Sequence, residues 1–250
     1  MLEHKKIQNL SDYFVELNSR REKGVYFYRI NGYSEEVGEF IKKYYDTARR
    51  TGVVIEGKIP NPDEGNLAYY NEIMGMDFQM SMDFIHVSLR KWLPRMNEFQ
   101  RQNVAASIYD SLDSLRKAGK TENMIRNAYI KFMCWLYYKF ERIVNQLGEN
   151  HIPKILYEGQ ISNYELMLIS ILSNAGCDVV LLQYAGDQGY LKTDPGSVLS
   201  DSLQMEGLQP FPQGYCVKKV RDEIQNELNN ERLYLSLIHI SEPTRPLYIS

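Results

Sequence analysis

The stretch PKILYEGQISNYELMLISILSNAGCDVVLLQY, residues 153–184, constrains the fold more than any other part of the chain. It predicts a strand at 154–157, then a helix, then a second strand at 177–184 whose residues are almost all apolar. The spacing of Ser162 and Glu165 matches a capping box, which marks where the helix begins. A continuous apolar strand is typical of a parallel sheet covered on both faces. The stretch therefore predicts a strand–helix–strand unit with a right-handed crossover.

A second unit of this kind is predicted near the N-terminus. Residues 24–30 (GVYFYRI) and 53–57 (VVIEG) are rich in β-branched and aromatic residues, as strands are. Between them, Ser34 is a suitable helix cap, and Val37, Ile41 and Tyr44 contribute to an apolar helical stripe. Whether the two units share one sheet stays open at this point.

Three further regions show helical periodicity. In residues 4–23, apolar side chains recur at helical spacing from Leu10 to Leu17, which predicts a helix that ends at Gly24. Residues 81–147 carry three apolar stripes, which predict three helices separated by proline and glycine. Residues 217–232 predict a charged, weakly amphipathic helix.

These patterns predict an α/β fold, a Rossmann-like parallel sheet with a large helical insertion or subdomain. We divide the chain into an N-terminal α/β unit at 1–80, a helical region at 81–148, and a Rossmann-like βαβ unit at 149–234. We expect the last unit to be truncated, for the reason given below for residues 235–250.

Composition and charge narrow the function classes. The net charge of −3 argues against a general nucleic-acid binder, because neutralising phosphates needs a basic surplus. A basic patch for an anionic partner stays open on the first unit: Arg20, Arg21, Lys42, Lys43, Arg49 and Arg50. The chain has no apolar run of about 18 residues, so we expect no membrane span. It opens on a charged, polar segment, and its three cysteines are far apart, so we expect a cytoplasmic protein.

Candidate ligand-binding residues follow the predicted strands, because open parallel sheets bind ligands beyond the carboxyl ends of their strands. The candidates are Glu158, Gly159, Ser162 and Asn163 after the strand at 154–157, Tyr184, Gly186, Asp187 and Gly189 after 177–184, and Lys58, Asn61 and Asp63 after 53–57. The start of the helix at Ser162 offers free N–H groups that favour a phosphate. We therefore expect a small phosphorylated metabolite, such as a nucleotide or a sugar phosphate.

No stretch of the chain matches a catalytic motif. The patterns GxGxxG, GxxxxGK[ST], HExxH and GxSxG are all absent, so catalytic residues and cofactors stay unassigned. Simpler interpretations compete at each candidate: Glu158 is also typical of a solvated loop, and residues 186–189 of a turn. His86 suits a core position, Cys177 suits a small buried hydrophobe, and the isolated histidines predict no metal site.

Two stretches carry a family resemblance. FYRINGY with the helix after it and VVIEGKIPNP, together with residues 153–184, resemble the Firmicute YceG-type family over residues 20–230. That family consists of components of a biosynthetic module, found beside tellurite-resistance and stress-response genes. The resemblance implies a part in making or handling a small metabolite, alongside partner proteins from the same gene cluster. It supplies no catalytic residues, so an enzyme and a noncatalytic partner in a resistance complex both stay open.

The end of the chain departs from this pattern. LSLIHISEPTRP, residues 235–246, resembles a translated transposase sequencing adapter, because the adapter DNA encodes all of these residues in one frame. We therefore expect residues 235–250 to be non-native, the native sequence to break near Tyr234, and the chain to be a truncated fragment. The alternative is a native amphipathic tail.

Overall fold

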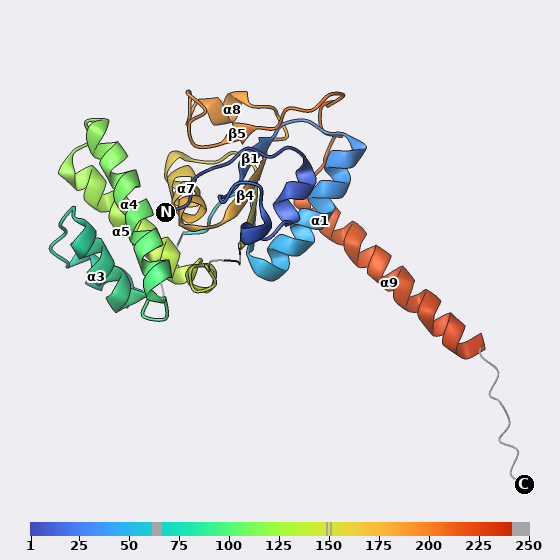
Figure 1. Cartoon of the computed structure of the whole chain (residues 1–250), viewed down its shortest axis with the longest axis horizontal. Helices are drawn as coiled ribbons and strands as arrows, with labels where there is room; N and C mark the ends of the chain where they lie inside the picture. The colour runs from blue at the N-terminus through green and yellow to red at the C-terminus, as the bar shows by residue number, and fades with distance from the viewer. Residues whose placement is uncertain (62–66, 149, 151, 242–250) are drawn as a thin grey trace, which may run out of the picture.

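Five strands form a single parallel sheet at the centre of the molecule. The computed structural model describes residues 1–61, 67–148, 150 and 152–241 (Figure 1). The sheet order is β2-β3-β4-β1-β5. The strands are β1 (Phe27–Ile30), β2 (Val53–Glu56), β3 (Lys154–Glu158), β4 (Asp178–Leu182) and β5 (Asp201–Ser202). This confirms the predicted Rossmann-like α/β fold, and it shows that the two predicted units share one sheet.

The two units are interleaved within this sheet. Strand β1 pairs with β4, with Phe27 opposite Val179, while β3 lies between β2 and β4. The helix α1 (Glu35–Thr51) therefore carries the chain from β1 past β4 and β3 to the far edge. Ser34 caps α1 as predicted, its hydroxyl accepting from the N–H of Val37. At the other end of α1, Gly52 passes so close to β3 that a Cβ would lie 1.7 Å from the Lys154 carbonyl oxygen.

Helices cover both faces of the sheet. On one face lie α1 and the first turns of α9 (Val217–Ser241), whose apolar side chains pack on Tyr28, Ile30 and Val180. On the other face α7 (Asn163–Ala175) lies against the sheet, and α4 (Glu98–Lys117) packs on α7. The remaining helices on this side are α2 (Leu67–Met74), α3 (Met82–Trp92), α5 (Glu122–Tyr138), α6 (Glu141–Val144) and α8 (Gln188–Leu191).

Residues 81–147, for which three helices were predicted, contain α3, α4, α5 and the short α6, beside the sheet in Figure 1. Each of the three long helices starts at a polar cap: Ser81, Asn97 and Thr121. In each case the side-chain oxygen accepts from the N–H three residues on, which satisfies one of the free donors of the first turn.

The helix predicted over residues 4–23 is wrong. This segment contains only two short 3-10 helices, η1 (Leu10–Phe14) and η2 (Leu17–Ser19). A capping box between Asn9 and Asp12 closes the first turn, and the backbone is extended again at Val15. The hydroxyl of Tyr13 donates to the carbonyl of Val179 at 2.8 Å. The apolar residues of this segment therefore pack on the sheet, and we call residues 4–23 the wrapping segment. Helical spacing alone does not reveal this arrangement.

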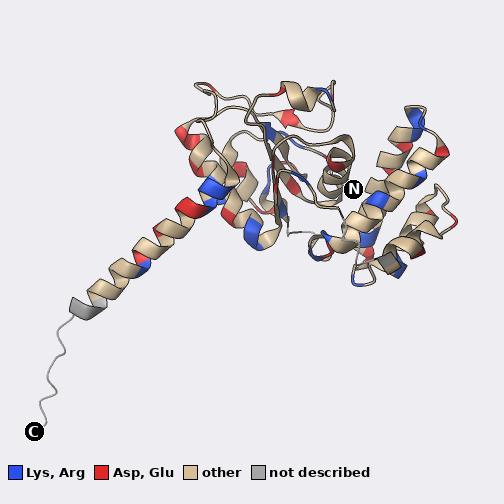
Figure 2. Cartoon of the chain, turned by 180° about the vertical axis from the view of Figure 1, so that it is seen from behind, with Lys and Arg blue, Asp and Glu red and all other residues tan. Residues whose placement is uncertain are grey.

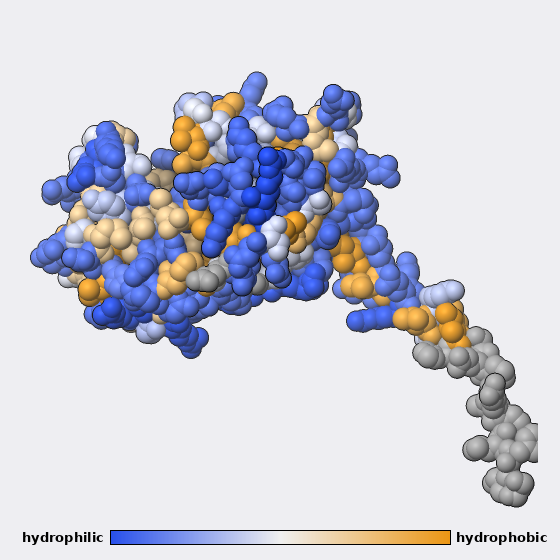
Figure 3. Space-filling model, viewed as in Figure 1, coloured by the Kyte–Doolittle hydropathy of each residue, from blue (hydrophilic) through white to orange (hydrophobic). Residues whose placement is uncertain are grey.

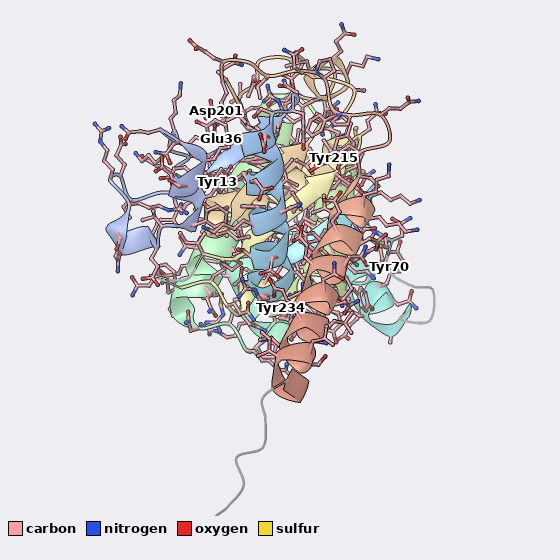
Figure 4. All side chains as sticks on the ribbon, turned by 90° about the vertical axis from the view of Figure 1, so that its right-hand side faces the viewer. Tyr13, Glu36, Tyr70, Asp201, Tyr215 and Tyr234 are labelled. Atoms are coloured by element: carbon pink, nitrogen blue, oxygen red, sulfur yellow. The ribbon has the colours of Figure 1, made fainter. Side chains whose placement is uncertain are left out.

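Helix α9 is longer than the predicted 217–232 and projects from the body (Figure 1). Val217 and Val220 are buried on the α1 face, whereas Leu228 is 40% exposed and Leu233 62% exposed. Tyr234 lies far along the helix from its attached end (Figure 4). Among the described helices, none is long and apolar enough to cross a bilayer.

Candidate functional site

The carboxyl ends of β1 and β4 form a topological switch point. Strand β1 leads into α1 on one face, whereas β4 leads towards α8, whose Tyr190 packs with the core of the opposite face. Because the two strands are neighbours, the chain leaves adjacent strand ends in opposite directions. Ligands of open α/β sheets bind at such a point. The residues that follow β1 and β4 are therefore candidates for ligand binding.

Three of the predicted candidates come together beside this point. The hydroxyl of Tyr184 donates to Glu158 Oε2 at 2.6 Å, and Gln183 Nε2 donates to the carbonyl of Gly159 at 2.9 Å. Burial and the nearby Glu158 carboxylate raise the pKa of the Tyr184 phenol, which keeps it a hydrogen-bond donor. The ends of β3 and β4 are thus joined through the candidates Glu158, Gly159 and Tyr184, together with Gln183, which sequence analysis did not select.

Glu158 also serves the start of α9. Its Oε2 atom accepts from the backbone N–H of Val217 at 2.8 Å, so a carboxylate lies at the positive end of a long helix. A second hydrogen bond connects α9 with β2, the neighbour of β3: Arg221 Nη1 donates to Glu56 Oε1 at 2.7 Å. Hydrogen bonds of Glu158 therefore connect β3 with β4 and α9. Glu158 is not a solvated loop carboxylate.

Asp187 pairs with Arg29, a buried residue of β1 that sequence analysis missed. Two of the guanidinium nitrogens donate to the two carboxylate oxygens, each at 2.8 Å. The hydrogen bond from Arg29 holds the pKa of Asp187 below its ordinary value. Arg29 is 1% exposed, stacks 4.2 Å from the Tyr190 ring centroid, and donates to the carbonyl of Ser200 at 2.7 Å. Gly186 provides the left-handed turn before Asp187, with φ of 84°.

An aromatic cluster lies over the same strand ends, and sequence analysis selected only one of its members, Tyr184. It consists of Tyr33, Tyr184, Phe211 and Tyr215, with neighbouring ring centroids 5.0 to 5.8 Å apart. Tyr215 lies at the attached end of α9 (Figure 4). The backbones of Tyr33 and Gln209 exchange two hydrogen bonds, at 2.6 and 2.8 Å, which hold the segment before α9 against the end of β1. This cluster could not be predicted, because its members come from three distant segments.

The candidates at the start of α7 have a different setting. Ser162 and Glu165 form the predicted capping box, and Glu165 is 6% exposed. Glu165 Oε1 also accepts from the N–H of Ile59 at 2.6 Å, which ties the loop after β2 to α7. Asn163 is exposed at the first position of the helix. A carboxylate at this helix start repels a phosphate, so it disfavours the phosphate position expected there.

The candidates after β2 lie apart from the switch point. Lys58 and Asn61 are exposed beyond the strand at the outer edge of the sheet, with β3 and β4 between them and β1. Asp63 lies outside the described residues. Gly189 is the second residue of α8 and lies near the side chain of Gln160.

His86 and Cys177, the remaining residues that sequence analysis considered, have contacts typical of structural residues. His86 is half-buried, and its ring nitrogen lies 3.0 Å from a Glu98 carboxylate oxygen. Cys177 is fully buried, as expected, and burial raises the pKa of its thiol, which disfavours a nucleophilic thiolate. Within the described parts of the chain, no three His, Cys, Asp or Glu side chains are grouped to hold a metal ion.

The parallel sheet, the helices on both faces and the switch point define a Rossmann-like α/β protein. The chain belongs to the YceG domain family, whose match covers residues 5–227. This match includes all five strands and every candidate residue named above. No curated protein and no solved structure matches the chain.

Proposed function

We propose that this protein binds a small phosphorylated metabolite, a nucleotide or a sugar phosphate, at the switch point between β1 and β4. One observation carries the proposal: the chain leaves these adjacent strand ends towards opposite faces, and polar and aromatic side chains gather there. Parallel α/β sheets bind their ligands at this position. The proposal assigns no reaction, so the protein acts either as an enzyme or as a binding subunit.

The aromatic cluster and its polar neighbours suit the uncharged part of such a ligand. Tyr and Phe rings offer faces on which a base or a sugar ring stacks. Asn31, directly after β1, carries both a donor and an acceptor, and its Nδ2 atom lies 3.1 Å from the Ser202 hydroxyl. The carboxylates of Glu158 and Asp187 are acceptors for sugar hydroxyls. These groups recognise a polyhydroxylated or heterocyclic ligand rather than a purely apolar one.

Side-chain cations suit the phosphate better than a helix N-terminus does. Lys218 and Lys219 lie in the first turn of α9, next to the end of β3, and Arg221 reaches the end of β2. Figure 2 marks Lys and Arg positions in blue where α9 joins the body. Because Glu165 occupies the start of α7, we place the phosphate near these cations.

The cellular role is proposed from the family resemblance. A Firmicute protein of this family would work in the cytoplasm, in a biosynthetic module linked to stress and tellurite resistance. Its partners would be proteins of the same gene cluster. A metabolite-binding site at the switch point agrees with that role, since such a module must bind its intermediates.

Calorimetric titration with a panel of nucleotides and sugar phosphates tests the proposal. We expect at least one ligand of the panel to bind, and Asn31→Ala to raise its Kd about tenfold through the loss of a hydrogen-bonding side chain. Asn71→Ala, at an exposed position of α2, is the matched control and should change the Kd less than twofold. If no ligand of either class binds, or if both variants weaken binding equally, the proposed site is wrong.

A noncatalytic partner role is the second candidate, and the exposed apolar side of α9 favours it. Leu228, Leu233 and Tyr234 are 40%, 62% and 67% exposed, and apolar surface runs along the projecting helix (Figure 3). A gene-neighbour protein should then co-elute with this chain in size-exclusion chromatography, and Leu228→Asp should abolish the complex. Separate elution of the two purified proteins would remove this candidate.

A further inference from the structure

A buried ion cluster lies at the amino end of the sheet, opposite to the switch point. Arg20 Nη1 and Lys154 Nζ lie 2.9 and 2.5 Å from oxygens of the Asp178 carboxylate. The three side chains are at most 7% exposed. Two cations thus share one carboxylate, so the cluster carries an excess positive charge. Charges withdrawn from water need compensation, which an anion close to the cluster would provide.

A cavity of about 420 Å³ opens in front of Arg20. It is lined by Lys5, Lys6, Ile7, Gln8, Asp12, Val15, Ser19, Arg20, Arg21, Glu22 and Tyr26. Its volume is within the usual range for sites that bind small molecules. The wrapping segment before β1 forms most of the wall, so this cavity is separate from the carboxyl edge of the sheet.

The charges that line the cavity are predominantly positive. Four of the lining residues are Lys or Arg, against Asp12 and Glu22. Both carboxylates are already engaged: Asp12 accepts from the N–H of Gln8 at 2.6 Å, and Glu22 lies 3.5 Å from Lys5 Nζ. Lys5 is also paired with Glu3, at 2.8 Å, and Arg20 with Asp178, so Lys6 and Arg21 are the lining cations without a carboxylate partner among the described residues, and these two favour an anion.

One buried donor at the cavity, Arg20, has capacity left for a ligand. Four N–H groups of Arg20 are accounted for, two by Asp178 and two by the carbonyls of Val15 and Gly24, which leaves one of five. Tyr26 is 5% exposed, and its ring lies 4.1 Å below the Arg20 guanidinium. The Tyr26 side chain also lines the cavity, and the backbone N–H of Tyr26 donates to Asp178 Oδ1 at 2.9 Å. A buried guanidinium with one N–H left over, beside a basic cavity, points to a ligand acceptor atom.

We propose that this cavity is a second binding site, which takes a small anion carrying a phosphate group. The phosphate accepts from Tyr26 and from the free N–H of Arg20, while Lys6 and Arg21 close over it from the exposed rim. The enclosed volume suits a free phosphate or a small phosphate ester, and it is too small for a polymer. This site stands independently of the proposed site at the switch point.

Titration of the full chain with inorganic phosphate, at constant ionic strength, tests this inference. We expect saturable binding, and the double variant Lys6→Ala/Arg21→Ala should raise the Kd at least tenfold, because charge-assisted hydrogen bonds are lost. Tyr26→Phe should raise the Kd about fivefold. Both rim residues are exposed, so the double variant should fold normally. Lys23→Ala, an exposed neighbour outside the cavity, is the matched control.

Three results would overturn the inference: no saturable phosphate binding, equal weakening by Lys23→Ala, or loss of phosphate binding in Asn31→Ala. The second would show diffuse surface attraction, and the third would place the phosphate at the switch point. If phosphate binds here while no nucleotide or sugar phosphate binds at the switch point, only the proposed function fails.

Discussion

Asp178 is the residue on which the amino end of the sheet depends. Its fully buried carboxylate accepts from Arg20, Lys154 and the backbone N–H of Tyr26, so it joins the wrapping segment, β3 and β1 at one point. In the sequence it is a single acidic residue at the start of an apolar strand. Its partners lie up to 158 positions away, which is why no local pattern could predict the cluster.

Asp178→Asn should lower the free energy of unfolding by about 3–5 kcal/mol, because it leaves two buried cations without a counter-charge. Urea denaturation at neutral pH measures this change. Asp46→Asn removes an exposed carboxylate paired with Arg49 and Arg50, and it should cost no more than about 1 kcal/mol. Equal losses in the two variants would contradict the role given to Asp178.

Asp187 should make stability depend on pH. Its pKa in the folded protein lies below the ordinary value of 3.8 because Arg29 donates to it. The ion pair therefore stabilises the fold above about pH 4, and this contribution is lost as the pH falls through the folded-state pKa. Asp187→Asn should be less stable than the parent at pH 6, and the difference should shrink towards pH 3. Denaturation curves that show the same deficit at both pH values would contradict the pairing.

At the scale of elements, local signals predicted α7 and the strands beside it well. The capping box at Ser162 marks one end of the helix, and Gly176, with φ of 133°, marks the other. The wrapping segment was mispredicted because its apolar residues are ordered by the sheet rather than by neighbours one turn away. The interleaving of β1 and β2 was also beyond prediction, since periodicity identifies strands but not their neighbours.

Gly52→Ala should destabilise the protein by at least about 3 kcal/mol. The cost comes from a Cβ placed 1.7 Å from the carbonyl oxygen of Lys154, where α1 meets β3. Gly119→Ala is the control: its φ is 76°, and nothing lies within 4 Å of an added Cβ. That variant should cost about 1–2 kcal/mol through backbone strain alone. A smaller loss at Gly52 than at Gly119 would contradict the close approach of α1 and β3.

A chain that ends at Tyr234 should keep its stability to within about 0.5 kcal/mol. Leu235 and Leu237 are 56% and 64% exposed, so residues there add little burial. The Val220 side chain is 2% exposed and packs against α1. Val220→Ala should therefore lower the free energy of unfolding by more than about 1 kcal/mol. Equal losses in the two proteins would show that residues 235–250 pack on the body.

At the scale of the whole molecule, the strand order decides which residues can share a site. The strand-end rule predicted Glu158, Tyr184 and Asp187 from the sequence alone. It could not select Arg29 or Asn31, because their position depends on β1 lying beside β4. The cavity near Arg20 was equally hidden, since the segment that lines it was expected to be a helix.

The most direct test of the switch-point site is amide chemical-shift mapping of the isotope-labelled chain with the nucleotide or sugar phosphate that binds most tightly. The largest shifts should fall at residues 31–33 and 183–187, on the ends of β1 and β4. A control titration with inorganic phosphate alone, at the same concentration, identifies the shifts that come from the second site, at residues 5–8. Shifts confined to the helical region at 81–148, or no shift at the ends of β1 and β4, would contradict the account.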